Sequence, residues 1–143
     1  MANALFDKGR QAFLEGDIDW TTAVIKAALV RGYTPNLATH TFVSDVTGAG
    51  GTLVATSGAL ASKTATDGVA DAADVTFSAV AAGAAIPYVL IFQSSAVGGG
   101  GDVAATAQRV IALIDTGTNL PVTPNGGDIT VAWDNGANRI FKL

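Results

Sequence analysis

The chain has 143 residues, the length of one domain, and carries a net charge of −4 with only 14% charged residues. Its eight Lys and Arg residues are scattered along the sequence, which excludes the clustered basic footprint of a nucleic-acid-binding protein. The absence of cysteine excludes disulfide and thiolate chemistry. Hydrophobic residues make up 49% of the chain and 17 residues are glycine, so we expect a poorly charged surface that other proteins partly cover.

The first segment has the pattern of an amphipathic helix. We expect a helix over residues 4–15, with Asn3 as its N-cap and Gly16 as its end. Four apolar residues share one face of this helix, so that face must pack against another element. These residues are Leu5, Phe6, Ala12 and Phe13.

The same segment lacks the basic-then-apolar order of a signal peptide. The longest apolar run, residues 80–92, is too short to cross a bilayer and contains Pro87. We therefore expect a soluble protein made in the cytoplasm, with no membrane partner.

Most of the remaining chain is rich in β-branched and apolar residues between turn signals, which is typical of short β-strands. The expected strands cover residues 21–30, 52–56, 59–66 and 74–80. Residues 31–51 form a long connection that contains Pro35, with one helical turn near residues 40–46.

Two later segments, residues 86–93 and 109–115, are apolar at successive positions. Because such a pattern places apolar side chains on both faces of a strand, we expect both segments at the centre of the fold. The glycine-rich residues 94–106 lie between them, and we expect a flexible loop there.

Residues 129–143 contain two alternating runs on either side of a five-residue turn, which predicts a closing β-hairpin. In this hairpin Trp133 faces Arg139, Val131 faces Phe141, and Ile129 faces Leu143, so all six side chains share one face. Arg139 would then lie over the Trp133 ring. We expect these last residues in the core or at an interface.

Strands that recur about every ten residues between turn signals predict a mainly β fold. We expect a two-sheet antiparallel β-sandwich, jelly-roll-like, with an N-terminal helix. The sequence shows no internal repeat and no domain boundary, so the sandwich is expected to span residues 1–143 as a single domain.

The sequence contains no convincing catalytic motif. His40 lies close to Ser44 and Asp45, but no G-x-S-x-G nucleophile elbow is present, so we interpret it as a loop or helix-cap histidine. The glycine run 98–101 is followed by Asp102, whereas a phosphate-binding loop needs a Lys-Ser/Thr pair. We therefore expect no enzyme activity and no cofactor.

Metal and sugar sites are also weakly indicated. Two acidic groups lack the ligand spacing of a calcium loop, so we expect no metal site within the chain, although a calcium ion between subunits stays open. The groups are Glu15, Asp17 and Asp19, and Asp67, Asp71 and Asp74. The rings of Trp20, Tyr33, Tyr88 and Trp133 could form a sugar-stacking platform, but core or interface anchors are the simpler interpretation.

Three stretches carry a family resemblance: "MANALFDKGRQAFLEGDIDW", "SKTATDGVADAADVTFSAV" and "LPVTPNGGDITVAWDNGANRIFKL". Together they resemble a family of small proteins encoded among the virion genes of tailed bacteriophages. The resemblance covers most of the chain apart from residues 96–106, and it implies a structural role in the virion without a reaction.

From this resemblance we expect a capsid decoration or cement protein, located in the virion and made in the bacterial host cytoplasm. Its expected partners are the major capsid protein and further copies of itself, as a dimer or trimer, with no nucleic acid. The alternatives are a tail, neck or fibre component, or a carbohydrate-binding β-sandwich module.

A cement protein needs broad apolar contacts, so the N-terminal helix, the 31–51 connection and the 94–106 loop are the expected contact elements. The candidate interface residues are Leu5, Phe6, Phe13, Trp20, Tyr33, Phe42, Trp133, Arg139, Phe141 and Leu143.

Overall fold

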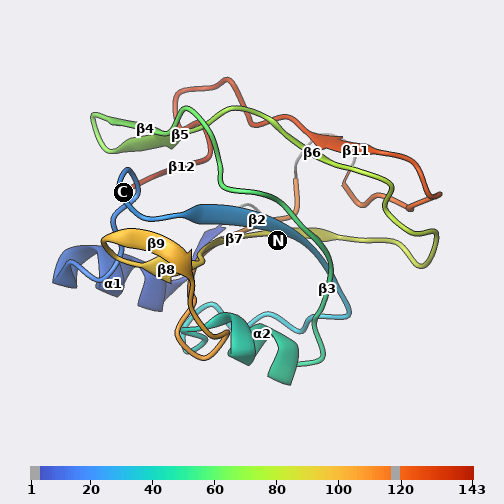
Figure 1. Cartoon of the computed structure of the whole chain (residues 1–143), viewed down its shortest axis with the longest axis horizontal. Helices are drawn as coiled ribbons and strands as arrows, with labels where there is room; N and C mark the ends of the chain where they lie inside the picture. The colour runs from blue at the N-terminus through green and yellow to red at the C-terminus, as the bar shows by residue number, and fades with distance from the viewer. Residues whose placement is uncertain (1–3, 117–119) are drawn as a thin grey trace.

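The computed structural model describes residues 4–116 and 120–143 and shows a mainly β protein (Figure 1). In this part of the chain, twelve strands form several antiparallel sheets, accompanied by two helices. The helices are α1 (Asp7–Glu15) and α2 (Val43–Gly48). The strands are β1 (Ala4–Leu5), β2 (Ile25–Arg31), β3 (Thr52–Thr56), β4 (Thr64–Thr66), β5 (Val69–Asp71), β6 (Val75–Phe77), β7 (Tyr88–Gln93), β8 (Ser95–Ala96), β9 (Gly99–Asp102), β10 (Arg109–Ile114), β11 (Ile129–Val131) and β12 (Phe141–Lys142).

A five-stranded sheet in the order β1-β10-β7-β2-β3 organises the molecule. All of its neighbouring strands are antiparallel. The two segments that are apolar on both faces, β7 and β10, lie inside this sheet, as their sequence predicts.

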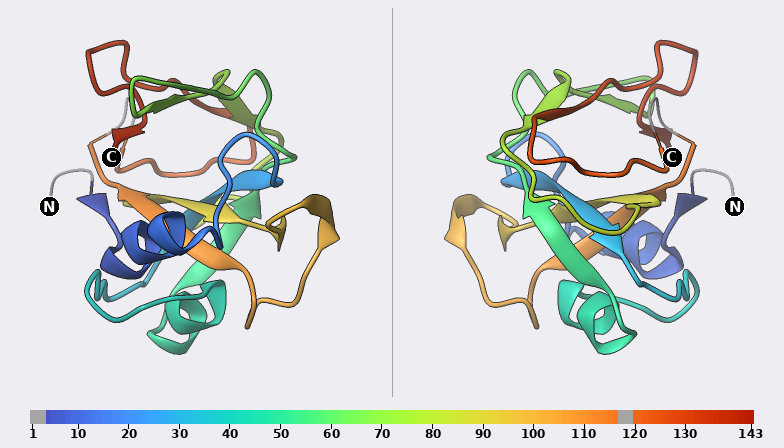
Figure 2. Two further views of the ribbon diagram at one scale, coloured as in Figure 1. Left: turned by 90° about the vertical axis from the view of Figure 1, so that its left-hand side faces the viewer. Right: turned by 90° about the vertical axis from the view of Figure 1, so that its right-hand side faces the viewer.

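Side chains from the two faces of this sheet enter two separate hydrophobic cores, because successive residues of a strand point to opposite faces. Leu29 and Ile91 enter the first core, and their neighbours Val30 and Leu90 enter the second. The small sheets β11-β6 and β12-β5-β4 lie over the first-core face, and α2 lies over the opposite face (Figures 1 and 2). The central strands are therefore buried on both sides.

The predicted C-terminal hairpin is wrong. Strand β11 pairs with β6, and β12 pairs with β5, so the two halves of residues 129–143 belong to different small sheets. Their alternating pattern fits any antiparallel partner, and these earlier strands compete successfully for the pairing. The expected contact of Arg139 with the Trp133 ring is also replaced: the Trp133 Nε1–H donates to the Ala73 carbonyl at 2.9 Å, and Arg139 donates to Asn135 at 3.1 Å.

The start of the N-terminal helix also differs from the expectation. The helix begins at Asp7, because Ala4 and Leu5 pair with Leu113 and Ala112 as an edge strand instead of joining the helix. The expected N-cap Asn3 lies outside the described residues. The helix ends as expected, with Gly16 in the left-handed conformation at φ 79°.

The glycine-rich segment is not simply a loop. Strands β8 and β9 form a small antiparallel hairpin with Val97 and Gly98 at its turn, and β9 begins with Gly99 and Gly100 at φ 90° and φ 102°, which glycine adopts without strain. Lys26 Nζ lies 2.8 Å from Asp102 Oδ2 and ties this hairpin to β2. The expected strand over residues 59–66 shortens to β4, and the strand expected from residue 21 begins at Ile25.

Candidate binding surface

The structure places most of the candidate interface residues inside the protein itself. Six of the ten are buried at 8% exposure or less and stabilise the two cores: Leu5, Phe6, Trp20, Tyr33, Trp133 and Phe141. Phe13 and Phe42 are partly buried, and the Arg109 guanidinium lies 5.4 Å from the Phe42 ring centroid. Only Arg139 and Leu143 are exposed, so the aromatic anchors are core residues in this chain.

Helix α1 leaves an apolar area exposed beside β12. Its Gly9 and Ala12 face the sheet and are buried, which turns Leu14 outward with 90% of its side chain exposed. Phe13 packs against Phe141 with ring centroids 5.9 Å apart. An open depression of about 420 Å³ lies here, which we call the apolar depression; it is lined by Arg10, Phe13, Leu14, Lys142 and Leu143.

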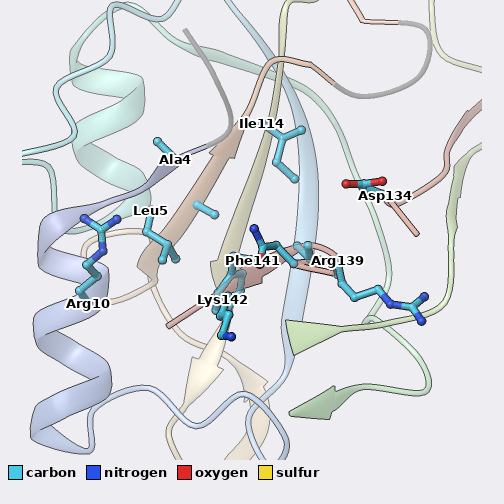
Figure 3. Close-up of a pocket in the computed structure, with 11 residues that line it drawn as sticks. Ala4, Leu5, Arg10, Ile114, Asp134, Arg139, Phe141 and Lys142 are labelled. Atoms are coloured by element: carbon cyan, nitrogen blue, oxygen red, sulfur yellow. The ribbon is translucent and has the colours of Figure 1, made fainter. Parts of the chain in front are cut away.

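A second cavity of about 370 Å³ adjoins the apolar depression (Figure 3). Its walls include Ala4 and Leu5 of β1, and it contains three cationic side chains. Figure 3 shows Arg10 on α1, Lys142 on β12 and Arg139 on the loop before β12, with the Arg139 guanidinium extending away from Arg10 and Lys142. We call this cavity the basic cleft, and Arg10 and Lys142 line both it and the apolar depression.

The charges of the basic cleft differ in how they are paired. Arg10 lies 3.0 Å from Asp7 Oδ1 on its own helix, and Arg139 lies 3.5 Å from Asp71 Oδ2. Lys142 has no ion-pair partner among residues 4–116 and 120–143. Asp134 also lines the cleft, so its three cations stand against one lining carboxylate and the two ion-pair partners Asp7 and Asp71.

The sequence hypothesis missed this cleft because the three cations are far apart along the chain. Arg10 precedes Phe13 by about one turn of α1 and Lys142 follows Phe141, so the packing of Phe13 on Phe141 brings the two cations together. The one local signal was the short spacing of Arg139 and Lys142 near the apolar Phe141.

His40 has a structural environment. Its Nδ1 lies 2.6 Å from the Tyr33 hydroxyl, and burial raises the pKa of Tyr33. Asp45 Oδ2 accepts the backbone N–H groups of Phe42 and Thr41 at 2.9 and 2.8 Å, and these two bonds lower the pKa of Asp45. These contacts hold the 33–45 segment and the start of α2 in place.

The acidic groups singled out in the sequence serve as turn and ion-pair residues. Asp19 Oδ1 accepts the N–H groups of Thr22 and Thr21 at 3.0 Å, which lowers the pKa of Asp19. Asp17 pairs with Arg109 at 3.0 Å. Within the described ranges, His, Cys, Asp and Glu residues form no group of three that could hold a metal ion.

The four rings of the possible sugar platform are divided between the two cores. Trp20 and Trp133 lie in the first core, whereas Tyr33 lies in the second with Tyr88 packed against it. Tyr33 and Tyr88 contact each other at 6.3 Å, and Trp20 contacts Phe141 at 5.2 Å. These rings therefore do not assemble into one platform.

The chain matches no protein-family model, no curated protein and no solved structure. Neither of the two helices in the described part of the chain is long and apolar enough to cross a membrane. The candidate surface is therefore defined by its geometry: an exposed apolar depression that continues into a basic cleft.

Proposed function

We propose that the protein is a structural component of a tailed-bacteriophage virion that decorates and cements the capsid. In this role it binds the major capsid protein and further copies of itself. The observation that carries the proposal is the apolar depression, where Leu14 and Leu143 are 90% and 58% exposed. Exposed apolar areas of this kind mark surfaces that a partner covers.

The resemblance of three long stretches to small virion proteins supports the placement in a virion. The composition supports it as well, because only 14% of the residues are charged and contacts with a shell must be broad and apolar. Edge strands β1 and β3 of the five-stranded sheet offer main-chain groups for further pairing. Many copies on one shell would multiply such weak contacts.

We also propose that the chain is a sandwich, with the small sheets as its second layer. The first core supports this arrangement, since it joins Ile91 of the five-stranded sheet to Phe77 of β6 and Val131 of β11. Phe141 of β12 contributes to the same core.

The copy number in purified particles tests the proposed function. A cement protein is expected in many copies spread over the shell, measured by quantitative gel electrophoresis and electron cryomicroscopy. A few copies confined to the tail or its vertex would instead support the tail, neck or fibre alternative. Absence from the particles would contradict both.

A matched pair of variants links the copy number to the apolar depression. Leu14→Ser is expected to lower the number of bound copies, because it removes the most exposed apolar side chain of the depression. Val97→Ser is the control, since Val97 is 40% exposed but lies on the β8–β9 hairpin, outside the depression. Equal losses for the two variants would show that the depression is not the contact.

A further inference from the structure

We propose that Asn135 is a site of self-modification, at which the chain converts its own side-chain amide into a carboxylate. The chain contains two Asn-Gly pairs, Asn125-Gly126 and Asn135-Gly136. Because glycine has no side chain to shield its backbone nitrogen, this nitrogen can attack the carbonyl carbon of the preceding Asn side chain. The fold places the second pair between a carboxylate and a guanidinium, whereas it holds the first pair in a backbone pairing. The reaction needs no partner and goes beyond the proposed function.

The nucleophile of this reaction is the Gly136 nitrogen, and Asp134 lies beside it. The Gly136 N–H donates to Asp134 Oδ1 at 3.0 Å. A carboxylate in hydrogen-bond contact with the proton that must leave is placed as a general base. As the Gly136 nitrogen bonds to the Asn135 side-chain carbon, its proton therefore passes to Asp134 along a hydrogen bond that is already formed.

Arg139 acts on the group that is attacked. Its Nη1 donates to Asn135 Oδ1 at 3.1 Å. Negative charge develops on this oxygen when the nitrogen adds to the side-chain carbon, and a cation within hydrogen-bond distance stabilises that charge, as in an oxyanion hole. Asp71 Oδ2 lies 3.5 Å from the same Nη1 and helps to fix the position of the guanidinium.

The bonds and protons of the reaction balance with water as the co-reactant. The bond between the Gly136 nitrogen and Asn135 Cγ forms, the Cγ–Nδ2 bond breaks, and Nδ2 takes the proton from Asp134 and leaves as ammonia. Water then opens the resulting succinimide ring at either carbonyl, which leaves aspartate or isoaspartate at position 135. An open cavity of about 430 Å³ borders Asn135, Gly136 and Arg139, so water reaches the ring.

The other Asn-Gly pair is held in an unreactive arrangement. The Gly126 N–H donates to the Val80 carbonyl at 2.8 Å, and the Val80 N–H donates to the Gly127 carbonyl at 3.0 Å. A neutral carbonyl oxygen is a far weaker base than a carboxylate, so the Gly126 nitrogen has no comparable proton acceptor in this contact. Asn125 Oδ1 accepts the Gly127 N–H at 2.9 Å, which is a neutral donor in place of a guanidinium. Position 125 therefore serves as an internal control.

Peptide mapping by mass spectrometry tests the proposal. The purified full chain is incubated at neutral pH, and deamidation is followed separately in the peptides that contain Asn135 and Asn125. In the folded chain we expect Asn135 to convert at least about tenfold faster than Asn125. In urea, where neither site keeps its contacts, the two rates should agree within about threefold. Equal rates in the folded chain, or the same ratio of rates in urea, would overturn the proposal.

Two variants separate the roles of the neighbouring side chains. Asp134→Ser leaves a hydroxyl oxygen that can accept the Gly136 N–H in the same kind of turn but removes the stronger base, so the Asn135 rate should fall at least about fivefold. Arg139→Gln removes the cation and should slow Asn135 by about threefold or more. The Asn125 rate is expected to stay within about twofold in both variants.

Lys8→Gln is the matched control for Arg139→Gln. It also removes a cation, but Lys8 lies on α1, bonds Gln11 and does not line the cavity beside Asn135, so the Asn135 rate should stay within about twofold. An equal loss of rate in Lys8→Gln, or an unchanged rate in Asp134→Ser, would refute the assigned roles.

The products provide an independent check on the route. Attack by the Gly136 nitrogen passes through the succinimide ring, so both aspartate and isoaspartate are expected at position 135. Electron-transfer fragmentation of the peptide distinguishes the two. Aspartate alone would indicate direct hydrolysis of the amide by water and would exclude the attack by Gly136. Both products, together with the faster rate in the folded chain, would support the proposal.

Discussion

Gly9 sits where helix α1 comes closest to the sheet. A Cβ atom added there would lie 2.9 Å from the Val110 carbonyl oxygen and 3.2 Å from the Ile111 Cα. Both are backbone atoms of β10, so neither can rotate away. This close approach is what allows α1 to bury Ala12 while it leaves Leu14 exposed.

We expect Gly9→Ala to lower the free energy of unfolding by about 1–3 kcal/mol, because overpacking against β10 outweighs the better helix propensity of alanine. Gly48→Ala is the matched control, since Gly48 also lies in a helix but a Cβ there would meet nothing within 4 Å. This control should be neutral or stabilising by up to about 1 kcal/mol. Urea unfolding of both variants checks the prediction, and a stabilised Gly9→Ala would contradict it.

Asp45 makes stability depend on pH. The N–H groups of Phe42 and Thr41 hold the pKa of this carboxyl below its ordinary range. A group whose pKa is lower in the folded state than in the unfolded state stabilises the fold above the unfolded pKa of about 3.9. That contribution is lost as the pH falls through the folded pKa.

We therefore expect Asp45→Asn to destabilise the protein by about 0.5–2 kcal/mol at neutral pH, as for the loss of a helix cap. The difference from the original protein should narrow as the pH falls below the unfolded pKa of about 3.9 toward the lower folded pKa. The urea unfolding midpoints of both proteins, at neutral and at acidic pH, measure this difference in stability. An equal difference at both pH values would show that the charge of Asp45 is irrelevant.

At the scale of elements, the interior strands were predictable and the pairing of the ends was not. Strands β7 and β10 are apolar on both faces, a pattern that a half-exposed strand does not have. Apolar and polar residues alternate just as clearly over residues 129–143, but this alternation shows only which side chains face the core and does not identify the strand that pairs with them. The true partners, β5 and β6, lie far away in the sequence.

The packing of β12 gives a prediction for this element. Phe141 is 8% exposed and packs edge-on against Trp20 at 5.2 Å. We expect Phe141→Ala to lower the free energy of unfolding by about 3–5 kcal/mol, because it removes a buried ring and leaves a cavity. Leu143→Ala, at a side chain that is 58% exposed, should change it by no more than about 0.5 kcal/mol. Similar losses for both would mean that β12 is not docked on the first core.

For the whole molecule, the candidate surface shows where sequence reasoning ends. The sequence predicted mainly aliphatic and aromatic residues as partner contacts, but most of them are buried in the two hydrophobic cores. The surface that remains depends on Arg10 and Lys142, which meet only after the chain has folded. Composition indicated that a contact surface exists, whereas its position required the tertiary structure.

The two-core architecture predicts how local stability is distributed. Amides of β7 should exchange with solvent most slowly, because both faces of this strand are covered and both of its neighbours are paired. Amides of β4, whose residues are all exposed, should exchange much faster. Hydrogen exchange followed by NMR measures both. Equal protection of β4 and β7 would contradict a stability centred on the five-stranded sheet.

When both faces of a sheet are apolar, the hydrophobic pattern alone does not determine the register of its strands. When one face of a sheet is exposed to solvent, a one-residue register shift of a strand costs free energy, because it moves apolar side chains from the core to the solvent. In β2, β7 and β10, a strand shifted by one residue would still bury apolar side chains, so hydrophobic burial hardly favours the native register over the shifted one. The choice falls to irregularities: the bulges at Leu29/Val30 and Val110/Ala112, and the Ser95 hydroxyl that accepts the Val24 N–H at 2.9 Å. The two bulges and this hydrogen bond therefore fix the register of the strands.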